Sequence, residues 1–364
     1  MEVISRRQLM LTGTSFVLNA TLLGPLVQVI QKGGTDAWMS VLVAALAAFL
    51  PVWMLAATAK RFPDRDLFQA LADRHPVAGR IIGFLYIGYF FFLLCRDYRM
   101  MVLFINITLL EFTPLLVVAL LILLCAVYMA RGGLEVTARV TELWMFTFAV
   151  SIFLLPLLLA SEMKIHHVFP MLYDGFAPVL HGAWYLFPFV GEIIALPFLA
   201  GFPTFGLKSG AKGFWLGIAC IFILLACSLL VLGASVASRF NFPAYEVVRL
   251  IQLTDFLDRL ELPLVAIWMP TMIAKLAFGM LIAGRGLSRM FPALSERELI
   301  LPFGTLAVVC SFALFRDLTE MLLVNRLLPF VALVFQIGLP LVLLLALRPG
   351  RRQTGRAPQP ARTK

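Results

Sequence analysis

Two ionisable residues stand inside apolar stretches long enough to cross a membrane, where a charge is costly and usually functional. Lys275 lies in the stretch 262–288, and Glu192 lies in the stretch 184–204. A partner of opposite charge or a water-filled cavity must stabilise the lysine. We expect an ion pair between the two residues, with a backbone carbonyl of the first stretch as the alternative partner. The pair would either act in coupling or serve only to hold helices together.

Residues that interrupt a helix occur near the middle of two stretches. The first stretch contains Asn19-Ala20-Thr21 followed by Gly24-Pro25, and the sixth contains Pro188, Gly191 and Pro197. Asn and Thr side chains can satisfy backbone groups that a break leaves without partners. Transporters with inverted repeats bind substrate at such broken helices, near the middle of the membrane. We predict one break at Asn19-Ala20-Thr21 and one around Gly191, although each position also has the simpler interpretation of a kink.

A substrate-binding pocket is expected near the middle of the membrane, between the first, third, sixth and eighth stretches. Tyr89 and Arg96 in the third stretch are seven residues apart, so they share a helical face. The predicted pocket residues are Asn19, Ala20, Thr21, Tyr89, Gly191 and Glu192, and Lys275 is the predicted coupling or structural charge. The third stretch also carries Tyr86, and Asp97 and Arg99 lie close to Arg96 nearer its outer half.

Membrane-spanning helices are the elements that must position these residues. Hydrophobic residues make up 61% of the 364 positions, charged residues make up 14%, and the mean hydropathy is +0.95. A soluble domain carries about a quarter charged residues, and a helix crosses the bilayer core in about 20 apolar residues. Ten stretches qualify, at roughly 8–30, 36–59, 78–106, 114–130, 137–160, 184–204, 213–237, 262–288, 299–315 and 324–347.

The net charge of +10 is distributed as in a membrane protein rather than a nucleic-acid-binding protein. With the N-terminus inside, 20 Lys and Arg residues fall on the inner side and 7 fall on the outer side. Cytoplasmic loops carry this excess of positive charge. We therefore expect both termini in the cytoplasm, a lipid bilayer around the helices, and no nucleic-acid partner.

Enzyme signatures are not found in the sequence. It contains no phosphate loop, no zinc-ligand helix and no Gly-x-Ser-x-Gly elbow. The five cysteines lie in apolar runs without a CxxC pair, which is typical of small buried hydrophobic residues. We expect no catalytic residues, no metal and no cofactor.

The long segment 161–183 divides the ten stretches into five and five. An odd number of helices per half inverts the second half relative to the first, as in transporters with inverted repeats. We predict one transmembrane domain, 1–347, with repeats at about 8–160 and 184–347. The segment 241–261 has apolar and charged residues on opposite helical faces, which favours an interfacial helix. The residues 348–364 are predicted to be a basic, disordered cytoplasmic tail.

Several blocks of sequence resemble the spore germination permease family, the B subunits of germinant receptors of the GerAB type. The most specific block is 245–261, Tyr-Glu-Val-Val-Arg-Leu-Ile-Gln-Leu-Thr-Asp-Phe-Leu-Asp-Arg-Leu-Glu, which leads into Val265-Ala266-Ile267-Trp268. Other matching blocks begin at Ile4, Asp36, Arg61, Gly83 and Arg131, so the resemblance covers nearly the whole chain. The family is similar to amino acid/polyamine/organocation transporters, which implies an all-α, LeuT-like fold with broken first and sixth helices.

The resemblance also implies a function, a place and partners. Family members lie in the spore inner membrane and work with an A subunit, itself a membrane protein, and a C subunit, a lipoprotein. A small germinant such as an amino acid is thought to bind the B subunit and trigger germination. Lys275 stands where the family tends to place a lysine, whereas Asn19-Ala20-Thr21 lacks the glycine that many members have there. Two alternatives are a working proton- or ion-coupled amino-acid transporter and a structural subunit with a vestigial pocket.

Overall fold

The computed structural model describes residues 4–61, 67–74, 77–199, 207–251, 260–291 and 293–346, which form helices and connecting loops without strands. The elements are α1 (Arg6–Leu23), α2 (Pro25–Gly33), η1 (Gly34–Asp36), α3 (Ala37–Ala59), α4 (Leu67–Arg74), α5 (Ala78–Thr108), α6 (Leu115–Arg131), α7 (Gly133–Leu158), η2 (Ile165–Val168), α8 (Ala177–Val190), η3 (Gly191–Ala195), α9 (Leu196–Leu199), α10 (Leu207–Leu232), α11 (Ala234–Ala237), α12 (Pro243–Arg249), α13 (Glu261–Met290), α14 (Glu296–Leu314), α15 (Leu318–Val324), α16 (Leu328–Ala332), η4 (Leu333–Gly338) and α17 (Leu339–Ala346).

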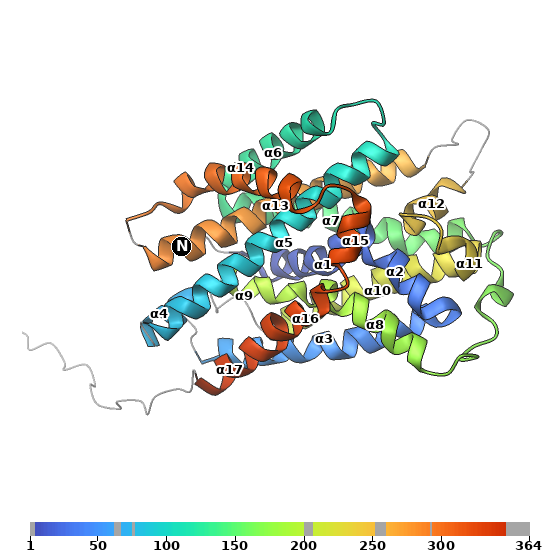
Figure 1. Cartoon of the computed structure of the whole chain (residues 1–364), viewed down its shortest axis with the longest axis horizontal. Coiled ribbons are helices and arrows are strands. Elements are labelled where there is room, and N and C mark those ends of the chain that lie inside the picture. The colour runs from blue at the N-terminus through green and yellow to red at the C-terminus, as the bar shows by residue number, and fades with distance from the viewer. Residues whose placement is uncertain are drawn as a thin grey trace, which may run out of the picture.

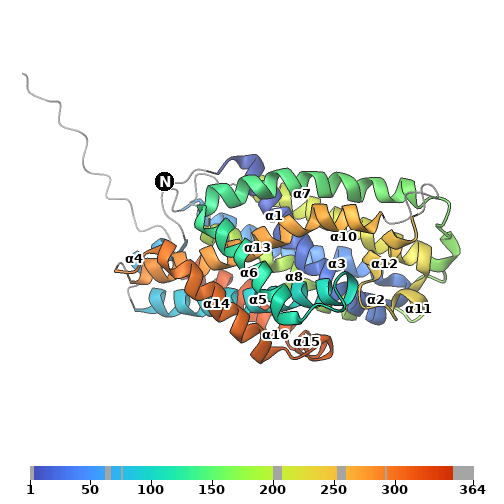
Figure 2. The same ribbon diagram turned by 90° about the horizontal axis from the view of Figure 1, so that it is seen from above.

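The long helices run roughly parallel and form one elongated bundle (Figure 1). The short helix α4 lies at one end of the bundle, and α11 and α12 lie at the other, as the perpendicular view also shows (Figure 2). We call these the α4 end and the α12 end. Helix α1 runs through the interior, where it packs against α10, α7, α13 and α8.

Eight helical stretches of the described residues are long and apolar enough to cross a membrane. The first of them, Pro25–Thr58, joins α2 to α3, which the sequence assigns to separate spans. With the 18-residue α1 and the shorter apolar helix α6, all ten predicted stretches contain a helix. The protein is therefore an integral, all-α membrane protein, as the sequence predicted.

Small residues allow α1 to pack closely against α10. A Cβ atom on Gly213 would lie 2.3 Å from the backbone oxygen of Met10, and one on Gly217 would lie 2.8 Å from the side chain of Val17. The two glycines are four residues apart, the spacing that lets membrane helices approach closely. The hydroxyl of Thr14 donates to the Gly213 carbonyl at 3.1 Å. Its polar group is thus satisfied within the bundle.

The first break lies at Gly24-Pro25, so the prediction of Asn19-Ala20-Thr21 was wrong. Helix α1 continues through those residues to Leu23, and α2 begins at Pro25 after Gly24 leaves helical geometry, with φ −143° and ψ −61°. Proline has no N–H, so the carbonyl four residues earlier, on Thr21, loses its helical donor. The side chain of Thr21 bonds within the helix, and that of Asn19 bonds to Ser15 and to Thr271 on another helix, so neither replaces a lost backbone bond.

The second break lies where the sequence predicted it. Helix α8 ends at Val190, the residues Gly191–Ala195 form the tighter 3₁₀ turn η3, and α9 resumes the helix. Pro188 inside α8 removes one backbone donor just before the change of geometry. A short 3₁₀ stretch inside a long helix often marks a hinge or a functional site.

Two boundaries differ from the sequence prediction. The sixth span begins at Ala177 rather than 184, because Pro178 occupies the first turn of α8, where a missing N–H is tolerated. The segment 161–183 is shorter as a loop in consequence. A helix within the segment 241–261 is observed over Pro243–Arg249, as α12, and its position at the membrane surface stays a prediction. The part of that segment at 252–259 and the predicted tail 348–364 lie outside the described residues.

Candidate functional site

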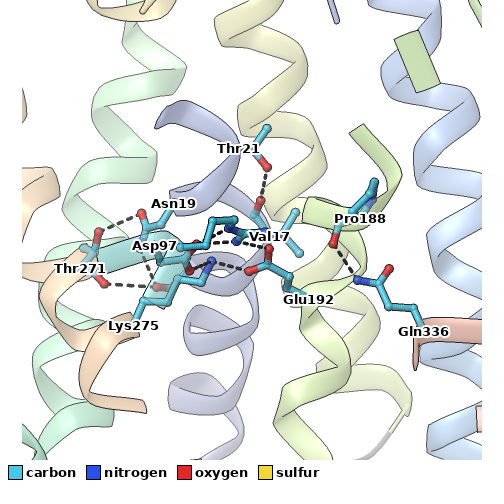
Figure 3. A network of polar contacts seen from close by, with 11 residues as sticks. Val17, Asn19, Thr21, Asp97, Pro188, Glu192, Thr271, Lys275 and Gln336 are labelled. Carbon is cyan, nitrogen blue, oxygen red and sulfur yellow. Dashed lines mark hydrogen bonds and ion pairs between the residues drawn. The ribbon is translucent and has the colours of Figure 1, made fainter. Parts of the chain in front are cut away.

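Four charged side chains meet in the interior of the bundle (Figure 3). Arg96 and Asp97 lie on α5, Glu192 lies in η3 and Lys275 lies on α13, and none is more than 3% exposed. The Nζ of Lys275 lies 2.6 Å from Oε2 of Glu192 and 2.9 Å from Oδ2 of Asp97. The Nη2 of Arg96 contacts Oδ1 of Asp97 and Oε1 of Glu192. Each cation therefore contacts both acids, and we call the four residues the charge ring.

The charge ring carries two positive and two negative charges, which offset one another. A buried charge costs several kcal/mol unless a partner of good geometry compensates it. Two aromatic faces add to the stabilisation of the cations. The guanidinium of Arg96 lies 4.5 Å from the ring centroid of Phe189, and the Nζ of Lys275 lies 5.7 Å from that of Phe16. A further monovalent ion would leave this balanced group with a net charge.

The predicted ion pair between Glu192 and Lys275 is confirmed. Arg96 and Asp97 as members of the same group were missed, although their position inside an apolar stretch was a usable signal. The sequence places them on the third span but does not give its depth or rotation. The 3₁₀ geometry of η3, which directs Glu192 toward α5 and α13, also depends on the tertiary packing.

A second polar group joins the last span to the broken sixth helix. The Nε2 of Gln336 donates to the Pro188 carbonyl at 2.7 Å and to the Tyr89 hydroxyl at 2.9 Å. Gln336 is fully buried and lies in η4, a π-helical turn. Such turns inside α-helices are frequent at functional sites. The ring of Tyr89 stacks on Phe335 at a centroid distance of 4.5 Å.

Gln336 is a site residue that the sequence analysis missed. Its signal was an amide in the middle of the apolar run 324–347. The predicted pocket residues Tyr89 and Gly191 both adjoin this side chain. Tyr89 does so through the hydrogen bond, and Gly191 through close contact, since a Cβ atom there would lie 1.9 Å from Oε1 of Gln336.

Asn19 belongs to a third group, which bridges α1 and α13. Its Nδ2 donates to the hydroxyl of Ser15 at 2.8 Å, and its Oδ1 lies 3.1 Å from the hydroxyl of Thr271. That hydroxyl also lies 2.6 Å from the carbonyl of Trp268. The contacts tie the two helices together one turn away from Lys275.

Thr21 and Ala20 are buried residues of α1 with structural roles. The hydroxyl of Thr21 donates to the carbonyl of Val17, four residues earlier, at 2.7 Å (Figure 3). This local bond is the usual one for a threonine inside a helix. Ala20 is fully buried. Both residues lie in the turn before the Gly24-Pro25 break.

A small cavity of about 20 Å³ adjoins the charge ring, and Asp97, Glu192, Lys275 and Phe16 line it. A space of about 10–15 Å³ by this measure holds one water molecule. The site is therefore closed around a volume for one or two waters in this conformation. Among the described residues, no group of three or more His, Cys, Asp or Glu side chains is arranged to hold a metal ion.

Solved structures of similar fold are transporters. The chain superposes on Mhp1, a nucleobase-cation-symport-1 family transporter in a closed conformation, with a TM-score of 0.67 and 13% identity, over 94% of this chain and 77% of that one. A Na⁺-coupled sialic acid symporter matches with a TM-score of 0.59 and 12% identity, over 94% and 79%. At this identity the likeness shows the fold, which is LeuT-like.

Sequence relatives are spore germination proteins of Bacillus subtilis (strain 168). The putative spore germination protein YfkT is 30% identical over 348 residues, which cover 96% of this chain and 97% of that protein. Spore germination protein KB is 24% identical and covers 94% of each chain. A family model described as "Spore germination protein" matches residues 3–317. The chain thus belongs to the spore germination permease family, and it is a membrane protein of transporter fold rather than an enzyme.

Proposed function

We propose that this protein is the B subunit of a spore germinant receptor, which binds a small germinant such as an amino acid at the charge ring. The observation that carries the proposal is the buried ring beside the 3₁₀ break of the sixth span. It places the carboxylates of Asp97 and Glu192 and the ammonium group of Lys275, from α5, η3 and α13, around one cavity. A zwitterion carries the two charges that such a ring complements.

The cavity must open for an amino acid to enter, because about 20 Å³ holds only water. Opening is most readily accommodated at the two breaks, Gly24-Pro25 and Gly191–Ala195, where helical hydrogen bonds are already interrupted. Of the predicted binding residues, Glu192 lines the cavity and Gly191 precedes it in the chain. The further binding residues proposed, which would come within reach of the ligand on opening, are Tyr89, Asn19, Ala20 and Thr21. Binding would select the open conformation, which neighbouring subunits then read.

The proposed partners are the A subunit, a membrane protein, and the C subunit, a lipoprotein. The proposed localisation is the spore inner membrane, with both termini in the cytoplasm. Support comes from membership of the spore germination family and from the excess of Lys and Arg on the inner side of the predicted topology.

Lys275 is proposed to act as an internal cation that replaces a bound metal ion. Its ammonium group already lies between Asp97 and Glu192, 2.9 and 2.6 Å away. A bound sodium ion would have to displace it or add an unbalanced charge to the ring. The shape of the pocket would then depend on the ionic contacts among the four ring residues and not on a bound sodium ion.

A second candidate function is an active proton- or ion-coupled amino-acid transporter, favoured by the likeness to solved symporters. Assays on the purified protein distinguish the receptor, the transporter and the structural subunit. A receptor subunit is stabilised by its germinant but accumulates no labelled solute in vesicles. A transporter is stabilised by its substrate and also accumulates it. A structural subunit with a vestigial pocket is neither stabilised nor able to accumulate the solute.

The proposed pocket is tested in spores. A bulky residue at Ala20 or Gly191 is expected to abolish the germination response at unchanged protein level, and an unchanged dose–response in both variants contradicts the proposed pocket.

A further inference from the structure

A second cavity, of about 60 Å³, lies toward the α12 end of the bundle, beside α12, α13 and the last turn of α1. We call it the α12 chamber, and its walls include Leu22, Phe104, Ala244, Glu261, Val265 and Trp268. It shares no lining residue with the cavity of the charge ring. Space for one water is about 10–15 Å³ by this measure, so the chamber has room for about four to six non-hydrogen atoms, the size of a small aliphatic side chain.

Aromatic rings form much of the chamber wall. Phe104 lies at their centre, with ring centroids 5.0 Å from Phe242, 5.6 Å from Tyr245 and 5.3 Å from Trp268. Leucine and valine side chains complete an apolar surface that suits an aliphatic group. Ring faces also attract a cationic group.

Two polar groups interrupt this apolar surface. Glu261 lines the chamber and is 3% exposed. The indole N–H of Trp268 is buried and has no hydrogen-bond acceptor within the part of the chain that the structure describes. A buried indole N–H normally has a partner, since leaving a donor unsatisfied is costly. An acceptor on a bound molecule would satisfy it.

The chemistry of these two groups restricts the ligand. Glu261 and Trp268 are seven residues apart on α13, which places them on one helical face. The carboxylate of Glu261 can accept a charge-assisted hydrogen bond from a cationic group, and the indole N–H of Trp268 can donate one to an anionic group. A small zwitterion such as an α-amino acid offers both groups, whereas a diamine has no acceptor for the indole N–H.

We propose that the α12 chamber is a second small-molecule site, which binds a small aliphatic α-amino acid. The ammonium group contacts Glu261, the carboxylate accepts from the indole N–H of Trp268, and the side chain occupies the apolar chamber. The Thr271 hydroxyl contacts the Trp268 carbonyl and Asn19, so the site adjoins the polar bridge to α1. The proposal goes beyond the receptor function and does not depend on it.

The test uses full-length protein in nanodiscs and three matched probes. These are L-leucine, isopentylamine, which lacks the carboxylate, and 4-methylpentanoate, which lacks the ammonium. Leucine is expected to bind at least about tenfold more tightly than either analogue, because each lacks one charge-assisted bond. Trp268→Phe should abolish the preference over isopentylamine alone, and Glu261→Gln the preference over 4-methylpentanoate alone. Trp215→Phe, at an exposed indole on α10, is the control and should change neither.

A filling variant separates this chamber from the charge ring. Ala244 is buried in the chamber wall, and Ala244→Leu adds three carbon atoms to it, so leucine affinity should fall at least about tenfold by loss of space. Wild-type protein that does not bind leucine, or leucine binding unchanged by Ala244→Leu, overturns the proposal. Should that variant not fold, the probe preferences of Trp268→Phe and Glu261→Gln decide alone: unchanged preferences in both also overturn it. The charge-ring pocket is tested separately, by the germination response of spores that carry a bulky residue at Gly191.

Discussion

A Cβ atom on Gly191 would lie 1.9 Å from Oε1 of Gln336 and 2.6 Å from its Cδ. The last span therefore inserts a buried amide against the first residue of η3, in space that any other residue at 191 would occupy. Because Gln336 also donates to the Pro188 carbonyl, it supports the broken helix on both sides of the change from α to 3₁₀ geometry.

This contact predicts a coupled pair of substitutions. Gly191→Ala should destabilise the protein by about 1–3 kcal/mol through overpacking. In the Gly191→Ala/Gln336→Ala double variant the new methyl group has space, so the combined loss should be smaller than the sum by about 1 kcal/mol or more. Thermal unfolding in detergent is measured for Gly191→Ala, for Gln336→Ala and for the double variant. Gly88→Ala is the control, since a methyl group at that position would meet no described atom within 4 Å apart from its chain neighbours and the backbone of its own helix. Additive effects of the two substitutions would disprove the coupling.

Lys275→Met should impair folding and function together. It leaves Asp97 and Glu192 with Arg96 as their single cation in the ring, and breaking a buried ion pair costs about 3–5 kcal/mol. Lys275→Arg should not rescue function, because a planar fork does not replace a compact ammonium group that contacts both acids. Unfolding temperature and the germination dose–response are the measurements.

The same ring predicts that sodium has no effect on the wild-type protein. Germinant affinity measured in sodium and in choline buffers of equal ionic strength should agree within error. A strict sodium requirement, or a fully active Lys275→Met protein, would contradict the role proposed for Lys275. In Lys275→Met, by contrast, an added cation should restore some stability, because the ring then has one uncompensated negative charge.

Arg99 is expected to fix the end of α14. Its Nε donates to the Phe315 carbonyl at 2.9 Å, its Nη2 donates to the Arg316 carbonyl, and its guanidinium lies 4.2 Å from the ring centroid of Phe312. Arg99→Met should lower stability by about 1–3 kcal/mol, because buried carbonyls lose charged donors. Thermal unfolding measures the loss, and Arg326→Met, at an exposed arginine, should be near neutral.

The topology predicts opposite accessibility of two labelling sites. A cysteine at Tyr173, which is 81% exposed between η2 and α8, should react with an impermeant reagent from outside, and one in the tail 348–364 only from inside. The five native cysteines are first replaced, which removes the exposed Cys125. Labelling of both sites from the same side would contradict the predicted orientation.

The sequence by itself determined the fold class, one of the two helix breaks and one ion pair of the charge ring. Stretches of about 20 apolar residues specify membrane helices, because lipid leaves the backbone no other partner than itself. The break at Gly191 and the pair of Glu192 with Lys275 followed from local rules: a proline or glycine interrupts a helix, and a charge in an apolar span requires a partner.

Only the tertiary structure decided which residues complete the site. Arg96 and Asp97 enter the charge ring, and Gln336 reaches Tyr89 and Pro188, because of the rotation and depth of α5 and the π-helical turn of the last span. The first break lies at Gly24-Pro25 and not at Asn19-Ala20-Thr21, because Pro25 has no N–H with which to continue the helix. The side chains of Asn19 and Thr21 bond instead to Ser15, Thr271 and Val17. Local sequence specifies the groups that need partners, but the packing of helices distant in the chain selects those partners.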